Sequence, residues 1–154
     1  MAFREHLGEA VHITSVDPVG GMKEVALEHR GRTIVFDEVQ GAPGHCAALN
    51  ICMRHNLASN FKISESEVID VLGWAMKNRS EPVSCTGEAP VFENSIDPVD
   101  LHQLPIPHHW PEDRGRYMSA SIIIAEWAGN RNVSYHRQFV RDANHVVARL
   151  VPRH

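Results

Sequence analysis

The stretch that decides the fold is residues 117–140, with the sequence YMSASIIIAEWAGNRNVSYHRQFV. Its first part, Tyr117 to Trp127, contains three consecutive isoleucines and is typical of a β-strand. Ala128-Gly129-Asn130 follows and is typical of a hairpin turn. Residues 132–140 and 145–151 have the composition of two further strands. The carboxy-terminal part of the chain is therefore predicted to be an antiparallel meander.

The amino-terminal part has a different pattern, in which short helices and strands alternate. From the spacing of apolar residues and from turn signals, the expected elements are helices over residues 3–11, 22–29 and 64–77 and strands over residues 11–13 and 33–36. The third helix has the clearest beginning, because Ser64 and Glu67 have the spacing of a capping box. Residues 46–52 fit either a buried strand or a helix, because so short an apolar run does not distinguish the two.

A proline-rich segment, from about residue 78 to residue 111, separates the two parts and is predicted to be a loop. A loop of this length is uncommon in a compact domain, so it is either functional or wraps one lobe onto the other. Within it, adjacent residues His108 and His109 would point in opposite directions, which favours a solvated loop over a metal pair. The predicted fold is α+β, with an amino-terminal α/β lobe over residues 1–95 and the opening strands of a β-barrel-like lobe over residues 96–154.

The composition excludes several classes of protein. Hydrophobic residues make up 43% of the 154 residues and charged residues 22%, which is typical of a globular protein. The net charge of -4, without a basic run, argues against a nucleic-acid partner. The three cysteines fit no Cys-x-x-Cys pattern, which argues against a disulfide framework or a structural zinc site and favours a cytoplasmic protein. We expect neither a signal peptide nor a membrane span, because no stretch approaches roughly 20 apolar residues.

One predicted strand carries an unusual number of polar side chains: Asn132-Val133-Ser134-Tyr135-His136-Arg137. Strand alternation places Asn132, Ser134 and His136 on one face and the other three side chains on the opposite face, unless a bulge re-aims them. A solvated edge strand explains this pattern without a ligand, and the segment alone slightly favours that interpretation. The alternative is an anion or cofactor site, because arginine binds phosphate or carboxylate bidentately and because asparagine and histidine can share a divalent metal.

Three segments of the sequence are distinctive: LPIPHHWPEDRGRY at residues 104–117, the Asn-x-x-x-x-Arg pattern at residues 132–137 and LVPRH at residues 150–154. They resemble the UbiD family of prenylated-flavin-dependent decarboxylases. Residues 34–41 and 93–97 are similar to earlier parts of the family's sequence, though more loosely. The resemblance implies that the second lobe is the beginning of the split β-barrel that binds the flavin in this family.

The resemblance also implies roles for individual residues. A manganese ion, with potassium as a further candidate, would be bound by Asn132 and His154. The prenylated flavin mononucleotide would be bound by Ser119, Asn132, Ser134, Tyr135, His136, Arg137, Arg153 and His154. Arg137 would be the catalytic arginine of the family's Glu-Arg-Glu network, which manages the proton that replaces carbon dioxide.

The chain also departs from the family pattern. Members of the family are much longer, and this sequence lacks the glutamate that serves as the third metal ligand and both glutamates of the acid network. The resemblance therefore implies the amino-terminal subunit or segment of a reversible decarboxylase that acts on an unsaturated or aromatic carboxylic acid, with another protein chain completing the barrel. The alternative is a non-catalytic flavin-binding or scaffold protein with a shortened fold.

Overall fold

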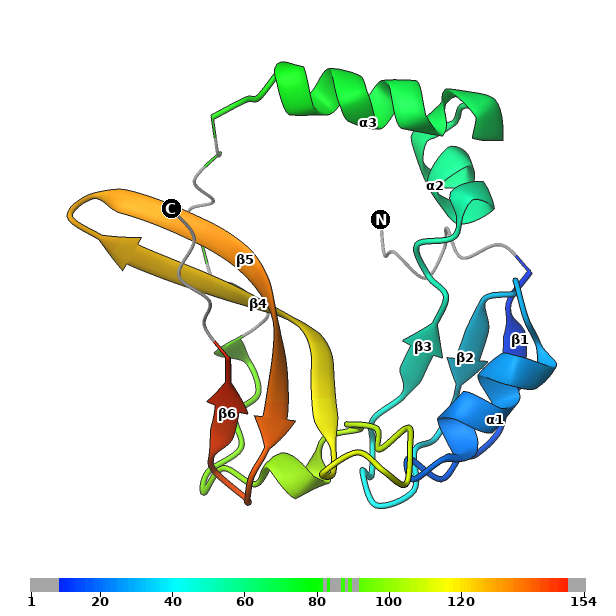
Figure 1. The fold of residues 1–154 in the computed structure, drawn as a ribbon, viewed down its shortest axis with the longest axis vertical. Helices are drawn as coiled ribbons and strands as arrows, with labels where there is room; N and C mark the ends of the chain where they lie inside the picture. Colours follow the sequence, from blue (N-terminus) through cyan, green and yellow to red (C-terminus); the bar gives the residue numbers. More distant parts are fainter. Residues whose placement is uncertain (1–8, 82, 84–86, 88, 90–91, 150–154) are drawn as a thin grey trace.

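The computed structural model describes residues 9–81, 83, 87, 89 and 92–149. The helices are α1 (Gly21–Glu28), α2 (Arg54–Phe61) and α3 (Val68–Lys77), and the strands are β1 (Val11–Ile13), β2 (Ile34–Phe36), β3 (Ala47–Leu49), β4 (Tyr117–Trp127), β5 (Asn130–Val140) and β6 (Val146–Ala148). In the described part these strands form two three-stranded sheets. Figure 1 shows the sheets on opposite sides of the view, with α2 and α3 carrying the chain from one towards the other. The predicted α+β class is thus confirmed for the described residues.

The first sheet has the order β1-β2-β3. Strands β1 and β2 run parallel, with α1 connecting them, while β3 runs antiparallel to β2. The predicted strand over residues 33–36 is confirmed, and residues 46–52, which fitted strand or helix, contain strand β3. Residues 47–49 form a strand because they pair with β2: Ala47 lies opposite Phe36, and Leu49 lies opposite Ile34.

The first sheet packs around a core of buried apolar side chains. Ile34 and Phe36 are 0% exposed, because both side chains point from β2 into a cluster of buried apolar residues. Helix α1 contributes Met22 to this cluster. The helix predicted over residues 22–29 is therefore confirmed, and it forms because its apolar side packs against the sheet. The helix predicted over residues 3–11 falls mostly outside the described residues.

Helix α3 confirms the helix predicted over residues 64–77 and begins as its capping box predicts. The Ser64 backbone N–H donates to the Glu67 carboxylate (2.9 Å), and the Ser64 hydroxyl donates to the same oxygen (2.6 Å). A 3-10 turn, Glu65–Glu67, leads into the helix, which leaves Trp74 and Met76 exposed. Helix α2 was not predicted from the sequence. Within the described ranges, no helix has the length and apolar character needed to cross a membrane.

The second sheet is an antiparallel meander with the order β4-β5-β6, as the sequence predicts. Its hairpin turn contains Ala128 and Gly129, both with positive φ angles of 50° and 78°. Strand β6 covers residues 146–148 rather than the predicted 145–151, of which the last two lie outside the described residues. A register shift between Met118 and Ser121 marks a β-bulge in β4.

The segment that precedes β4 joins the two sheets. The His108 backbone N–H donates to the Pro18 carbonyl (2.9 Å), and the His108 carbonyl accepts from Gly20 (2.8 Å). The Lys23 ammonium lies 4.5 Å from the centroid of the Trp110 ring, which adds a cation–π contact between the same parts. This part of the proline-rich loop therefore wraps one lobe onto the other. The prediction of a solvated loop is wrong for His108, which is half-buried and paired through its backbone.

Candidate functional site

The polar side chains of β5 form one face of the long hairpin. The Ser134 Oγ and His136 Nε2 atoms lie 2.9 Å apart, within hydrogen-bond distance, so both side chains are on the same face. Asn132 shares this face because it lies two residues before Ser134 in the same strand. On β4, the residues opposite the three are Ala125, Ile123 and Ser121. The predicted alternation is therefore confirmed, and the face offers hydroxyl, imidazole and amide groups.

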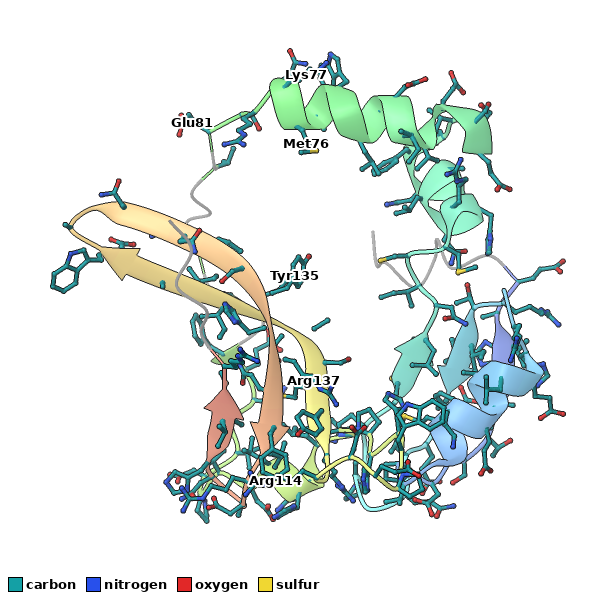
Figure 2. All side chains as sticks on the ribbon, in the orientation of Figure 1. Met76, Lys77, Glu81, Arg114, Tyr135 and Arg137 are labelled. Atoms are coloured by element: carbon teal, nitrogen blue, oxygen red, sulfur yellow. The ribbon has the colours of Figure 1, made fainter. Side chains whose placement is uncertain are left out.

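The opposite face of the hairpin is apolar and exposed. Tyr135 lies opposite Ile122, and Val133 lies opposite Ile124; their exposed fractions range from 58% to 75%. Figure 2 shows Tyr135 and Arg137 pointing from β5 towards the side on which the first sheet lies. This arrangement separates Tyr135 and Arg137 from the polar face, so the predicted flavin-binding residues are divided between two faces.

The interpretation of β5 as an edge strand needs correction. In the sheet β5 is the central strand, because β4 pairs with one edge and β6 with the other. Strand β6, however, pairs only with residues 138–140, so within the described part the polar residues 130–137 pair with β4 alone. The polar part of β5 is thus paired with β4 along one edge, and along its other edge it can pair with a further strand.

Arg137 is held by two neighbours that lie before or at the start of β4. Its Nη2 donates to the Asp113 carboxylate (3.1 Å), and its guanidinium carbon lies 4.0 Å from the centroid of the Tyr117 ring. Tyr117 in turn contacts Phe139, with 5.2 Å between the ring centroids. Sequence reasoning missed Asp113 and Tyr117 as partners of Arg137, because the fold brings together residues 24 and 20 positions apart, one in a loop and one in a strand. The only signal was that both belong to the segment 104–117 that carries the family resemblance.

Ser119 lies in the bulge of β4. Ser119 and Ala120 together stand opposite Arg137, because Met118 pairs with Gln138 and Ser121 pairs with His136. Ser119 is exposed. The structure therefore brings this predicted cofactor residue next to the predicted catalytic arginine along the ladder.

The predicted metal site is only partly within the described residues. Arg153 and His154 lie outside them, so Asn132 is the one predicted metal ligand that the structure describes, and it is exposed. Among the described residues there is no group of three or more His, Cys, Asp or Glu side chains that could hold a metal ion. The polar face of β5 suits a flavin phosphate, because hydroxyl, amide and imidazole groups can donate to it. For a metal ion, the described part supplies one oxygen donor and needs others.

The carboxy-terminal part of the chain matches a known domain family. Residues 83–154 match the UbiD family, described as the 3-octaprenyl-4-hydroxybenzoate carboxy-lyase Rift-related domain. Over 153 residues the chain is 31% identical to the anhydromevalonate phosphate decarboxylase of Methanosarcina mazei. The aligned region covers 94% of this chain and 33% of that protein. The chain thus spans about a third of the length of this curated relative.

Solved structures show the same relationship over almost the whole chain. The UbiD-class enzyme HmfF from Pelotomaculum thermopropionicum in complex with FMN is similar with a TM-score of 0.83 and 30% identity, covering 99% of this chain and 37% of that one. An evolved dimeric form of HmfF in complex with prenylated FMN gives a TM-score of 0.81 and 28% identity, covering 99% and 39%. Residues 83–154 are therefore a UbiD-family domain, and the chain corresponds to the amino-terminal part of UbiD-class decarboxylases.

Proposed function

We propose that this chain is the amino-terminal subunit or segment of a prenylated-FMN-dependent decarboxylase that acts on an unsaturated or aromatic carboxylic acid. The observation that carries the proposal is the two-sided strand β5. One face gathers Asn132, Ser134 and His136, while the other presents Arg137, already oriented by an ion pair and an aromatic ring. The FMN complexes of similar HmfF structures support a flavin for this chain.

The flavin would be held by the predicted residues of the second lobe. Ser134 and His136 would bind its phosphate end from the polar face, and Asn132 and His154 would hold a manganese ion, or potassium, next to it. Ser119, Tyr135 and Arg153 would contact the rest of the cofactor. When bound, the prenylated flavin supplies an electron sink for the electrons that the departing carboxylate leaves behind.

Arg137 would bind the carboxylate of the acid substrate. Arginine presents five N–H donors, and only one Nη2 contact is used by Asp113, so other donors remain for a carboxylate. The Methanosarcina mazei relative is named an anhydromevalonate phosphate decarboxylase, which makes a phosphorylated unsaturated acid the first substrate to test. The resemblance assigns the handling of the proton to glutamates that this sequence lacks, and further metal ligands would have to come from outside the described residues.

A second polypeptide or a longer chain would complete the enzyme. The exposed apolar face of the β4–β5 hairpin and the edge at residues 130–137, where β5 pairs with no described strand other than β4, support a partner that extends this sheet. In this proposal residues 1–95 are the amino-terminal lobe and residues 96–154 the first part of the split flavin-binding barrel. The two-thirds of the relative that this chain does not cover would correspond to the completing part.

Replacing Arg137 with lysine in the completed enzyme tests the proposal. Lysine keeps the charge but loses the planar fork, so turnover should fall by orders of magnitude at matched flavin content. Arg131→Lys is a matched control, because Arg131 lies on the same strand and makes an exposed ion pair with Glu126 (2.9 Å). Such pairs contribute only about 0–1 kcal/mol, so this control should keep its activity.

The outcomes distinguish the two candidate functions. Loss of decarboxylation in Arg137→Lys, with flavin retained, supports the enzyme. Flavin binding with no decarboxylation by any assembly of the native chain would instead support a non-catalytic flavin-binding or scaffold protein. His154→Ala, followed by metal analysis of the assembly, tests the metal: unchanged manganese or potassium content would show that His154 is not a ligand.

A further inference from the structure

We infer that Asp113 is a positioning residue for Arg137: its carboxylate fixes the guanidinium on the Tyr117 ring and so aims the remaining N–H donors at the substrate. The inference rests on the proposed function, because it gives Asp113 a part in the same reaction. It concerns a carboxylate within this chain, separate from the glutamates of the acid network that the family resemblance implies and that this sequence lacks.

The two side chains of the ion pair differ in how exposed they are. The side chain of Asp113 is 26% exposed, whereas that of Arg137 is 56% exposed. The acid is therefore the more enclosed partner, and the guanidinium is the one that reaches outward. Its Nη2 donates to Asp113 at 3.1 Å, and the guanidinium carbon lies 4.0 Å from the centroid of the Tyr117 ring. Two contacts with different partners restrict the guanidinium more than either contact does alone.

The loop that carries Asp113 is itself fixed by hydrogen bonds. The Asp113 N–H donates to the Trp110 carbonyl (3.0 Å). The Asp113 carbonyl lies 3.1 Å from the Nε2 atom of His108, which donates when its proton is on Nε2. His108 is anchored by its backbone to Pro18 and Gly20 of the first lobe. Arg137 is thus tied through Asp113 to the junction of the two lobes.

The end of the same loop packs directly on β5. A Cβ atom added at Gly115 would lie 3.1 Å from the Phe139 ring, so the loop passes Phe139 at a distance that only glycine permits without adjustment. The Tyr117 N–H then donates to the Pro107 carbonyl (3.1 Å), which closes the loop. Because both ends are held, the Asp113 carboxylate has a defined place opposite Arg137, as expected of a residue that orients another.

The test compares Asp113→Asn with Asp113→Glu, Arg137→Lys and the double variant Asp113→Asn/Arg137→Lys in the completed enzyme. Asparagine has nearly the same shape as aspartate but no charge, so the loop's backbone hydrogen bonds should persist. We expect Asp113→Asn to lower kcat tenfold or more with a smaller change in KM, and Asp113→Glu to recover part of the loss. In the Arg137→Lys background, Asp113→Asn should add less than a twofold loss, because Asp113 acts through Arg137.

A second readout does not depend on activity. In nitrogen-edited NMR spectra of the intact chain, the Arg137 Nε–H signal should move in Asp113→Asn and stay in place in Glu126→Gln, the matched control that breaks the exposed Glu126–Arg131 pair. An unmoved Arg137 signal, or equal losses from Asp113→Asn with and without Arg137→Lys, would overturn the inference. Full activity in Arg137→Lys would instead overturn the proposed function and the catalytic part of this inference, and the spectrum would then decide only whether Asp113 fixes Arg137.

Discussion

In the described residues the two sheets have the same number of strands but differ in how far their apolar side chains are buried. In the first, strands of three residues enclose side chains such as Phe36, which is 0% exposed. In the second, strands β4 and β5 have 11 residues each, yet Ile124 is 66% exposed. Strand length therefore does not determine whether a sheet has a core; a layer that covers its apolar face does.

The difference assigns separate tasks to the two regions. The first sheet packs with α1 around a cluster of buried apolar side chains. The second sheet shows a row of exposed apolar side chains, which in soluble proteins marks a surface that another part covers. The first region therefore contributes a buried core, and the second contains the residues of the proposed site.

Replacing Phe36 is the most direct test of the difference in burial between the two sheets. Replacing this fully buried residue with alanine removes a large side chain from the core and leaves a cavity, which should destabilise the chain by about 3–5 kcal/mol. Urea unfolding followed by circular dichroism measures the loss. Tyr135→Ala removes an aromatic ring that is 75% exposed and should cost far less. Equal losses in the two variants would mean that the sheets do not differ as described.

Association with the completing polypeptide tests the exposed face. Ile124→Ser should leave the melting temperature of the chain nearly unchanged but weaken association roughly tenfold or more, because an apolar contact is lost on assembly. Leu27→Ser is the control, since Leu27 is an exposed apolar residue on α1 of the first region. Sedimentation or calorimetric titration gives both affinities. Similar affinities for the two variants would show that the hairpin face is not the contact surface.

Gly115 tests how tightly the loop before β4 is packed. Gly115→Ala would place a methyl group 3.1 Å from Phe139, and the resulting overpacking should cost about 1–3 kcal/mol. Gly73→Ala is the opposite case: nothing lies within 4 Å of its added Cβ, and alanine favours the helix α3. Thermal unfolding should therefore show a lower melting temperature for the first variant and a slightly higher one for the second.

The smallest effect concerns the start of α3. Hydrogen bonds from the Ser64 hydroxyl and backbone N–H hold the pKa of Glu67 below its ordinary value of 4.5. A lowered pKa in the folded state stabilises the fold above the ordinary pKa, and this contribution is lost as the pH falls through the lowered value. Glu67→Gln should therefore lower the melting temperature slightly at pH 7 and have no effect in strong acid, whereas Glu65→Gln should have little effect at either pH.

The sequence predicted elements whose local signals agree with their packing. The capping box of Ser64 and Glu67 and the hairpin turn at Gly129 are such signals, and both elements formed as expected. Helix α2 was missed because it has no continuous apolar stripe. It is held instead by the buried side chain of Asn56, whose Nδ2 donates to the Thr33 hydroxyl (2.6 Å) and to the Ile51 carbonyl (3.1 Å). Such polar contacts across the fold leave no periodic trace in a sequence.

The candidate site was predictable to a similar extent. Alternation along β5 correctly placed Ser134 and His136 on one face, because it depends only on the strand. The partner of Arg137 could not be found in this way, since Asp113 lies in an irregular loop whose position depends on contacts of His108 with the first lobe. The face on which a side chain lies follows from the local geometry of its strand, whereas its contact partners depend on the path of the whole chain.

The bulge in β4 adds one residue to this strand without changing which faces of the two strands match. Ser119 and Ala120 share the place opposite Arg137, so β4 contains one residue more than its partner strand at this point. Met118 and Ser121 lie on the same face although three positions separate them, because their partners Gln138 and His136 are two positions apart. Deleting Ser119 or Ala120 would leave a regular ladder in which Ile122 and Ile124 keep their side. The hairpin should therefore tolerate the loss of one codon here, with both faces preserved and only the local bend and twist of the bulge removed.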